Sequence, residues 1–287
     1  MNRDKLIEII KERKSLLCVG LDPDFELIPN HLKKNDDWIF DFNKSIIDST
    51  KDLCVAYKPN LAFYEKYGSK GWSAFERTVE YIGDTHFIIA DAKRGDIGNS
   101  SKYYAQSFFE NTTCDAVTVS PYMGSDSVEP FLNYKDKWAV ILTLTSNPGA
   151  KDLQLTKVND KLTIERSDIQ NRQRWMKLFE HVTFQIKEWG TSYNTMLVVG
   201  ATKADYFQKI RKIVPDHFLL VPGIGTQGGN LDLVLENGLN SDFGLLINVG
   251  RDILYSSSGD DFDIKARERS IVYQTLMEKT LKDKKLI

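Results

Sequence analysis

The segment Phe87–Ser100, FIIADAKRGDIGNS, places four charged residues directly after a short apolar run. Side chains two residues apart on a β-strand point to the same face, so Asp91 and Lys93 are expected to lie together. Asp96 follows within a few loop residues. Carboxylates and an ammonium group are costly to bury at a strand end unless they pair or do chemistry. This segment is therefore the leading candidate for a catalytic site.

A second lysine, Lys58, ends the apolar run Leu53–Lys58 and can join this group from a neighbouring strand. With Asp91, Lys93 and Asp96 it would complete a network of alternating charge. Such an array suits the delivery of a proton by a positioned ammonium group to a carbanion that develops beside it. The alternative is a structural role, as an ion-pair ladder on the surface or a salt bridge between strands. The spacing DxKxxD alone does not exclude that alternative.

A glycine-rich turn, Pro222–Gly229 (PGIGTQGG), follows another apolar run. Its glycines allow backbone N–H groups to approach an anion closely. Arg251, one predicted strand later, supplies a forked cationic donor that suits phosphate oxygens. Taken alone, the glycines are equally consistent with a tight turn. Together with Arg251 they predict a phosphate-binding site.

Apolar, β-branched runs recur along the chain, with helical patterns between them. Near-continuous runs of this kind are typical of parallel strands that are buried on both faces. Eight of them in 287 residues favour an α/β fold of the (β/α)8 TIM-barrel type, and an open doubly wound sheet is the alternative. In a barrel, the polar residues that end the strands gather on one rim, where active sites lie. The predicted strands are Leu16–Leu21, Leu53–Lys58, His86–Asp91, Ala116–Ser120, Trp138–Leu144, Met196–Ala201, Phe218–Gly223 and Gly244–Val249.

The chain is expected to form a single domain, residues 1–287, with a polar insertion at about 148–171. This insertion, Pro148–Asn171, is rich in Lys, Asp and Thr, and either a lid or a solvated excursion fits it. Helices are predicted at Arg3–Lys14, Arg172–Gly190 and Ala266–Lys282. One apolar face of the second helix would carry Trp175, Leu178, Phe179, Val182 and Ile186.

The composition is that of a globular protein, with 41% hydrophobic and 27% charged residues. A net charge of −2 argues against general binding of nucleic acid or of a membrane surface. No apolar run reaches the ~18 residues of a membrane-spanning helix, and the charged N-terminal segment is not a signal peptide, so a cytoplasmic location is expected. Cys18, Cys54 and Cys114 are expected to be buried free thiols, and no spacing typical of a metal site occurs.

Six motifs occur in one order along the chain: VGLDPD, YKPN, DAKRGDIGNS, TSNPG, PGIGTQGG and NVGRD. In combination they resemble the orotidine 5′-phosphate decarboxylase family, and most closely its longer bacterial-type branch, from about Leu16 to Ile253. The resemblance implies decarboxylation of orotidine 5′-phosphate to UMP in de novo pyrimidine biosynthesis, with no cofactor. It also implies a homodimer in which Asp96 reaches into the partner's site, with Ile97 and Ser100 beside it.

The resemblance further implies a role for each of the other charged residues. Lys93 would protonate C6 of the substrate. Asp91 would sit beside the departing carboxylate, and Lys58 would hold Asp91 and the ribose. Asp22 would bind a ribose hydroxyl.

The remaining implied roles concern the base and the phosphate. Ser146 would read the edge of the pyrimidine, and Gln227 would bridge base and phosphate as its loop closes. Arg251 would clamp the phosphate, and Pro222, Gly223, Gly225 and Gly250 are further positions expected to bind the substrate.

Two rival functions stay open at this point. Sugar-phosphate decarboxylases and aldol-type synthases of the same barrel superfamily also carry a DxKxxD strand ending, but they use Mg²⁺. Ser146 together with Gln227 favours a nucleotide substrate instead. The other rival is a catalytically silent protein that binds a phosphoribosyl ligand, and the intact set of four charges argues against it because unused buried charges destabilise a fold.

Overall fold

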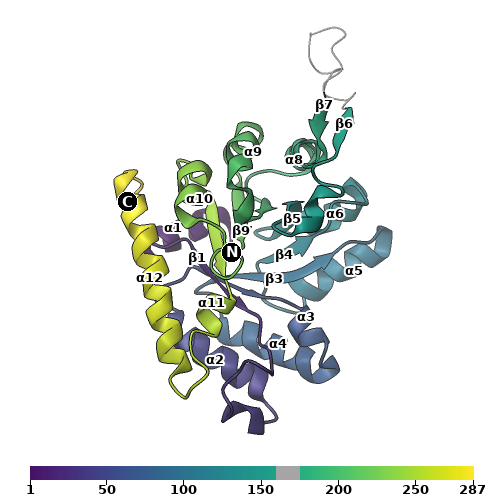
Figure 1. The fold of residues 1–287 in the computed structure, drawn as a ribbon. Helices are drawn as coiled ribbons and strands as arrows, with labels where there is room; N and C mark the ends of the chain where they lie inside the picture. Colours follow the sequence, from purple (N-terminus) through teal and green to yellow (C-terminus); the bar gives the residue numbers. More distant parts are fainter. Residues whose placement is uncertain (160–174) are drawn as a thin grey trace.

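The computed structural model describes residues 1–159 and 175–287. Within them, eight parallel strands close into a barrel and helices surround it (Figure 1). The strands are β1 (Leu17–Leu21), β2 (Ala56–Pro59), β3 (Phe87–Arg94), β4 (Ala116–Val119), β5 (Trp138–Leu144), β8 (Thr195–Val199), β9 (Phe218–Pro222) and β10 (Leu245–Val249). Around the barrel the order is β1, β10, β9, β8, β5, β4, β3, β2. Each predicted strand is present; β5 has its predicted bounds, and the others shift by a few residues at one or both ends.

The barrel is closed by its first and last strands. Leu17 of β1 pairs with Ile247 of β10, and Val19 pairs with Val249. This pairing confirms the predicted (β/α)8 barrel, and the alternative of an open doubly wound sheet is wrong. All residues of β1, β8 and β10 are buried, as expected for largely apolar strands that are covered on both faces.

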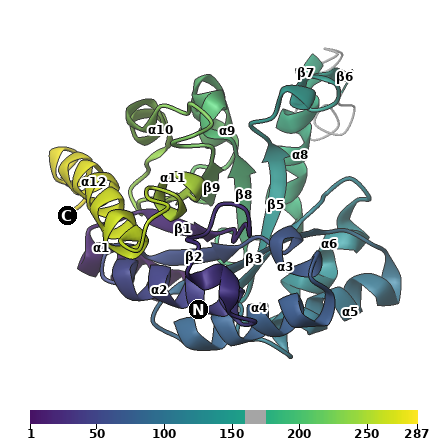
Figure 2. The same cartoon turned by 60° about the horizontal axis from the view of Figure 1, so that its bottom comes forward.

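The helices alternate with the strands along the chain and pack around the barrel (Figure 2). The first helix begins at Arg3, as predicted, because the Asn2 side chain caps it by accepting from the Lys5 backbone N–H at 3.0 Å. The helices are α1 (Arg3–Arg13), α2 (Trp38–Thr50), α3 (Ala62–Glu65), α4 (Gly68–Ile82), α5 (Gly98–Phe109), α6 (Ser125–Leu132), α8 (Leu178–Trp189), α9 (Phe207–Ile213), α10 (Leu231–Gly238), α11 (Arg251–Leu254) and α12 (Phe262–Asp283), with short 3₁₀ helices η1 (Leu32–Lys34), η2 (Pro148–Lys151) and η3 (Ala201–Tyr206).

The described part of the polar insertion contains short regular elements. It begins with η2, and a short strand, β6 (Lys157–Asn159), pairs in antiparallel fashion with β7 (Trp175–Lys177). The rest of the predicted insertion, and residues 172–174 of the predicted helix, lie outside the described residues.

The predicted start of the helix after the insertion is wrong. Residues 175–177 belong to β7, and Trp175 is 60% exposed rather than part of an apolar helix face. The helix α8 begins at Leu178 because the Glu180 carboxylate accepts from the Lys177 backbone N–H at 2.8 Å, which caps the first turn. The pattern of apolar residues runs through this cap, so periodicity alone placed the helix start too early.

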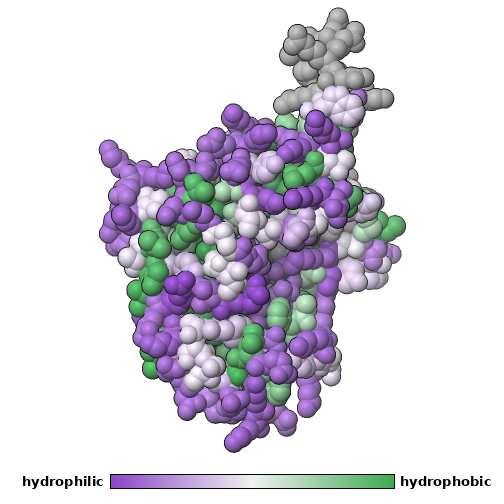
Figure 3. Space-filling model, in the orientation of Figure 1, coloured by the Kyte–Doolittle hydropathy of each residue, from purple (hydrophilic) through white to green (hydrophobic). Residues whose placement is uncertain are grey.

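The interior and the surface follow the composition. Cys18, Cys54 and Cys114 are buried and free, as predicted. Figure 3 shows that hydrophilic side chains cover most of the face seen there, with hydrophobic side chains scattered among them. Among the described residues, no helix combines the length and the apolar character needed to cross a membrane.

Candidate active site

Three of the four residues in the predicted charge network meet at the ends of β2 and β3. The Lys58 Nζ atom lies 2.9 Å from Asp91 Oδ2, and the Lys93 Nζ atom lies 2.6 Å from Asp91 Oδ1. The side chains of Lys58 and Asp91 are 4% and 10% exposed, whereas that of Lys93 is 50% exposed. One buried carboxylate therefore holds two ammonium groups, and the second of them is open to a ligand.

The electrostatics of this group keep it ionised. Burial raises the pKa of the Asp91 carboxyl, but the ammonium groups of Lys58 and Lys93 outweigh burial and hold this pKa well below its ordinary value. Burial lowers the pKa of Lys58, and the carboxylates of Asp91 and Asp22 outweigh that effect and raise it. Both groups of the buried pair are thus charged at neutral pH. The lysine that faces outward is held by a fixed negative charge, which is a preorganised arrangement.

A residue that the sequence analysis missed, Thr118 of β4, completes this group. Its hydroxyl donates to Asp91 Oδ1 at 3.0 Å and accepts from the Lys93 backbone N–H at 2.8 Å. Thr118 is 1% exposed. The only sequence signal is a hydroxyl residue at the centre of the apolar run Ala116–Ser120.

The backbone of Lys93 is in a left-handed conformation, with φ of 49°. The pairing of β3 with β4 shifts register between Ala90 and Arg94, which marks a β-bulge around Lys93. A left-handed conformation at a residue other than glycine costs on the order of 1–2 kcal/mol, and such residues concentrate at functional sites. The strained backbone therefore coincides with the residue predicted to carry the chemistry.

Asp22 follows β1 and lies beside this network. A Cβ atom on Gly250 would stand 3.5 Å from Asp22 Oδ2, which places the carboxyl group next to the end of β10. The Tyr255 hydroxyl holds the local backbone by donating to the Asp22 carbonyl at 2.7 Å. Burial raises the pKa of the Asp22 carboxyl, and the Lys58 ammonium opposes that rise. The structure thus places the buried Oδ1 acceptor of Asp22 near the Lys58 ammonium group.

Ser146 and Gln227, which come from the loops after β5 and β9, also meet. The Ser146 hydroxyl donates to Gln227 Oε1 at 2.9 Å. Gly200, at the end of β8, allows this arrangement, because a Cβ atom there would stand 2.6 Å from the Ser146 backbone nitrogen. The two residues predicted to contact the base are therefore neighbours in space.

The glycine-rich turn follows β9, of which Pro222 is the last residue. Gly223 and Gly225 adopt φ values of 104° and 83°, which favour glycine. Gly225 also packs closely on α11, because a Cβ atom on it would stand 2.8 Å from Asp252 Cβ. Arg251, the first residue of α11, is exposed and follows the adjacent strand β10. The turn and Arg251 therefore lie at the ends of neighbouring strands, as the phosphate-site prediction requires.

Asp96 does not join the network within this chain. Its carboxylate accepts from the Ile97 backbone N–H at 2.8 Å, and it forms no ion pair with another described residue. Ile97 is 58% exposed, and Ser100, in the first turn of α5, is also exposed. Among the described residues, this half-buried carboxylate therefore does not pair with the other three charges of its own chain.

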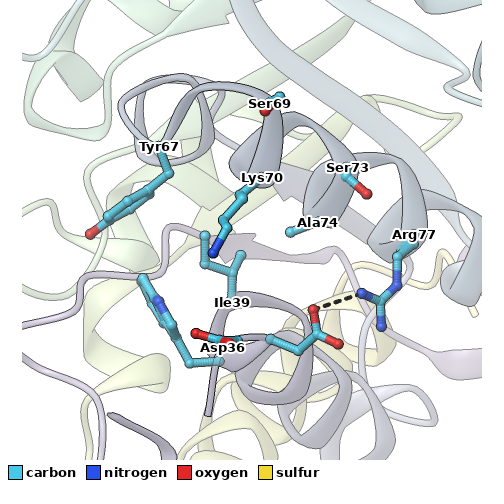
Figure 4. Close-up of a pocket in the computed structure, with 10 residues that line it drawn as sticks. Asp36, Ile39, Tyr67, Ser69, Lys70, Ser73, Ala74 and Arg77 are labelled. Carbon is cyan, nitrogen blue, oxygen red and sulfur yellow. Dashed lines mark hydrogen bonds and ion pairs between the residues drawn. The ribbon is translucent and has the colours of Figure 1, made fainter. Parts of the chain in front are cut away.

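A separate pocket of about 380 Å³ lies between the N-terminal ends of α2 and α4 (Figure 4). Tyr67 and Lys70 line it, and Asp37 pairs with the Arg77 guanidinium at 2.9 Å beside them. None of the residues predicted for the active site lines this pocket. The candidate site is therefore the rim of the barrel and not this pocket.

The sequence from residue 15 to residue 260 matches the family described as Orotidine 5′-phosphate decarboxylase / HUMPS. The chain belongs to this family. The match spans every residue of the site described above and confirms the family to which the motifs pointed.

Similar proteins cover nearly the whole chain. The orotidine 5′-phosphate decarboxylase of Phocaeicola vulgatus is 52% identical over 98% of this chain and 99% of its own length. Among solved structures, Leishmania donovani OMP decarboxylase has a TM-score of 0.77 and 34% identity, over 96% of this chain and all of its own. Leishmania donovani UMP synthase has a TM-score of 0.78 and 36% identity over 94% of this chain, which spans 56% of that longer protein. The orotidine 5′-phosphate decarboxylase / HUMPS fold is thus shared with these proteins.

Proposed function

We propose that this chain decarboxylates orotidine 5′-phosphate to UMP, as a step in pyrimidine biosynthesis, without a cofactor. Membership of the family and the names of its relatives support the reaction. The observation that carries the proposal is the buried Asp91 carboxylate with two lysines, one of which has a half-exposed side chain. A fixed cation with a proton to give is what a cofactor-free decarboxylation requires.

In the proposed reaction, Lys93 is the acid. When the bond between C6 and the carboxylate breaks, CO₂ leaves and the electron pair stays on C6. The Lys93 ammonium group stabilises this charge and then transfers a proton to C6, which leaves a neutral amine that water reprotonates. Asp91 would lie beside the departing carboxylate and hold Lys93 in place, while Lys58 keeps Asp91 ionised.

The rest of the rim would bind the nucleotide. Asp22 would accept a hydrogen bond from a ribose hydroxyl, which would supply the partner that its buried Oδ1 atom lacks among the described residues. Ser146 and Gln227 would contact the base. Arg251 would hold the phosphate together with the turn after β9, namely Pro222, Gly223 and Gly225, and with Gly250. Because the phosphate is remote from the reacting bond, its binding can orient the substrate.

We propose further that the active form is a homodimer. Asp96 has no ion-pair partner in its own described chain, and a second copy would bring it to Lys93 of the neighbouring site. Exposed apolar side chains on the segments that follow β3 and β4 support such an interface, because exposed apolar patches mark contact surfaces. They are Ile97 (58% exposed), Tyr103 (64%), Tyr104 (38%), Tyr122 (82%) and Met123 (44%). A cytoplasmic location and a single domain stay predictions.

The rival activity is that of the Mg²⁺-dependent sugar-phosphate enzymes of the same superfamily. The hydrogen bond between Ser146 and Gln227 favours the nucleotide substrate, because it gathers donors and acceptors that suit a base edge.

The test is an ultraviolet assay of the purified protein with orotidine 5′-phosphate, with and without EDTA. The same assay on Lys93→Ala tests the assigned acid. We expect rapid conversion to UMP that EDTA does not change, and a loss of at least ~1,000-fold in kcat for a correctly folded Lys93→Ala. Conversion that EDTA abolishes would support the metal-dependent rival. A Lys93→Ala variant with most of its activity would refute the assignment of the acid.

A further inference from the structure

Thr118 lies at the point where the catalytic strand departs from regular pairing. β3 and β4 pair at Ala90 with Val117 and again at Arg94 with Val119, so β3 holds extra residues between these points. In a bulge of this kind, the backbone N–H groups of the extra residues lose their partners in the ladder. The Lys93 N–H regains one, because it donates to the Thr118 hydroxyl at 2.8 Å.

The same hydroxyl also contacts the carboxylate that holds Lys93. Thr118 Oγ1 donates to Asp91 Oδ1 at 3.0 Å, and the Lys93 ammonium group lies 2.6 Å from the same oxygen. The hydroxyl, the carboxylate oxygen, the ammonium group and the backbone of Lys93 therefore form a closed ring of contacts. A buried hydroxyl with both its donor and its acceptor capacity used in this way fixes the backbone and the side chain of one residue together.

We propose that Thr118 is a positioning residue of the reaction: its hydroxyl holds Lys93 in the left-handed conformation that aims the ammonium group at the substrate. This inference rests on the proposed function of Lys93 as the acid. Thr118 itself touches neither the substrate nor the proton that is transferred. Its effect is on the geometry of Lys93 and Asp91.

The test compares Thr118→Val, which keeps the shape and removes the hydroxyl, with Thr118→Ser, which keeps the hydroxyl. For Thr118→Val we expect kcat to fall by about 10- to 100-fold, because small misplacements of a reacting group cost this much. KM should change by less than about threefold, because phosphate binding, remote from the reacting bond, stays intact. Thr118→Ser should restore kcat to within about threefold of the parent.

The matched control is Thr143→Val on β5. Thr143 is also buried, at 3% exposure, and among the described residues its hydroxyl bonds only to the carbonyl of Ile141, at 3.2 Å. Both valine variants lose one buried hydroxyl, so a merely structural effect would lower the midpoint of thermal unfolding in both and spare kcat per folded site. If Thr118→Val does not fold, Thr118→Ala takes its place with the same expectation.

A crystal structure of the Thr118→Val variant gives a readout that does not depend on activity. We expect φ of Lys93 to leave the left-handed region, or its ammonium group to move away from Asp91 Oδ1. An unchanged Lys93, or a variant with unchanged kcat, would overturn the inference. So would a Thr118→Ser variant that is as impaired as Thr118→Val. If the parent protein itself does not decarboxylate orotidine 5′-phosphate, the proposed function fails, while the crystal structure still tests the geometry.

Discussion

Asp22 shows how a binding residue can reduce the stability of its own fold. Burial raises the pKa of its carboxyl group, and Oδ1 has no hydrogen-bond partner among the described residues. A carboxyl group whose pKa is higher in the folded state than in the unfolded state binds its proton more tightly when folded. At pH 7 the ionised group therefore costs stability, and that cost disappears as the pH falls through the folded pKa.

We predict that Asp22→Asn raises the free energy of unfolding at pH 7 by about 1 kcal/mol and weakens substrate binding. The amide removes the buried charge, but it is a poorer acceptor for a ribose hydroxyl. Urea unfolding and the KM for orotidine 5′-phosphate measure the two effects. Asp36→Asn is the control, because Asp36 is an exposed aspartate on the following loop and should change neither quantity. A less stable Asp22→Asn would contradict the argument.

The charges of the site could be predicted from the sequence, but the way in which they are held could not. Asp91 and Lys93 were expected to share a face because they are two residues apart on a strand, and they do meet. They meet through a bulge with a left-handed lysine, which alternation does not describe. Thr118 could not be predicted because its contacts with Asp91 and Lys93 depend on the register between β3 and β4, which the sequence does not specify.

At the scale of elements, the described start of the insertion supports the end of β5. The side-chain amide of Gln154 accepts from the Thr145 backbone N–H at 2.7 Å and donates to the Thr145 hydroxyl at 2.9 Å. The backbone carbonyl of Gln154 also accepts from the backbone N–H of Phe179, in the first turn of α8, at 3.0 Å. The start of the polar insertion therefore holds Thr145, the residue next to Ser146, in place.

We predict that Gln154→Ala lowers kcat/KM by about tenfold, mainly through KM, because Ser146 is proposed to bind the base rather than to react. Steady-state kinetics with orotidine 5′-phosphate measure the effect. Gln208→Ala is the matched control. The side chain of this exposed glutamine on α9 bonds to Asn237 alone within the described part of the chain, so the variant should leave kcat/KM unchanged. Equal losses in both variants would mean that Gln154 acts through general stability alone.

The strands were predictable because their apolar runs are nearly continuous, and β5 matches its expected bounds at both ends. The start of α8 was not, because Trp175 and Met176 continue the helical pattern although they belong to β7. What ends the strand and begins the helix is a single contact, from the Lys177 backbone N–H to the Glu180 carboxylate. Local hydrogen bonding overrides periodicity at such a boundary.

At the scale of the whole molecule, the proposed dimer allows a complementation test. We predict that mixing Asp96→Asn and Lys93→Ala subunits restores activity that neither variant has alone. Each mixed dimer would contain one site with an intact lysine and an intact partner aspartate. Random exchange would recover up to about a quarter of the parent activity, and mass spectrometry would verify the mixed dimers. Verified mixed dimers with no activity would count against the shared site.

The stability of the whole chain should also depend on two buried histidines. Burial lowers the pKa of both His86 and His217 to about 4, so each is neutral in the fold at pH 7. In the unfolded chain each takes up a proton near pH 6.5, so stability is lost as the pH falls from about 6.5 towards 4.

We predict that this loss amounts to at most about 3 kcal/mol for each histidine. Both ring nitrogens of His217 lack partners among the described residues, so an apolar side chain can take its place. Urea unfolding at several pH values should therefore show that the free energy of unfolding of His217→Leu falls less between pH 6.5 and about 4.5 than that of the parent protein. A parent protein with constant stability between pH 6.5 and 4.5 would contradict the prediction.

The closing pair of strands has a consequence for how the molecule is made. Cys18 on β1 and Asn248 on β10 are neighbours although 230 residues separate them, and a Cβ atom on Gly20 would stand only 3.1 Å from the Gly250 Cα atom. During synthesis, β1 leaves the ribosome with one edge unpaired and waits until β10 emerges. Contacts between such distant segments form slowly. An unfinished chain would therefore already carry Lys58, Asp91 and Lys93, yet Asp22 would meet Arg251 only after β10 has emerged and paired with β1.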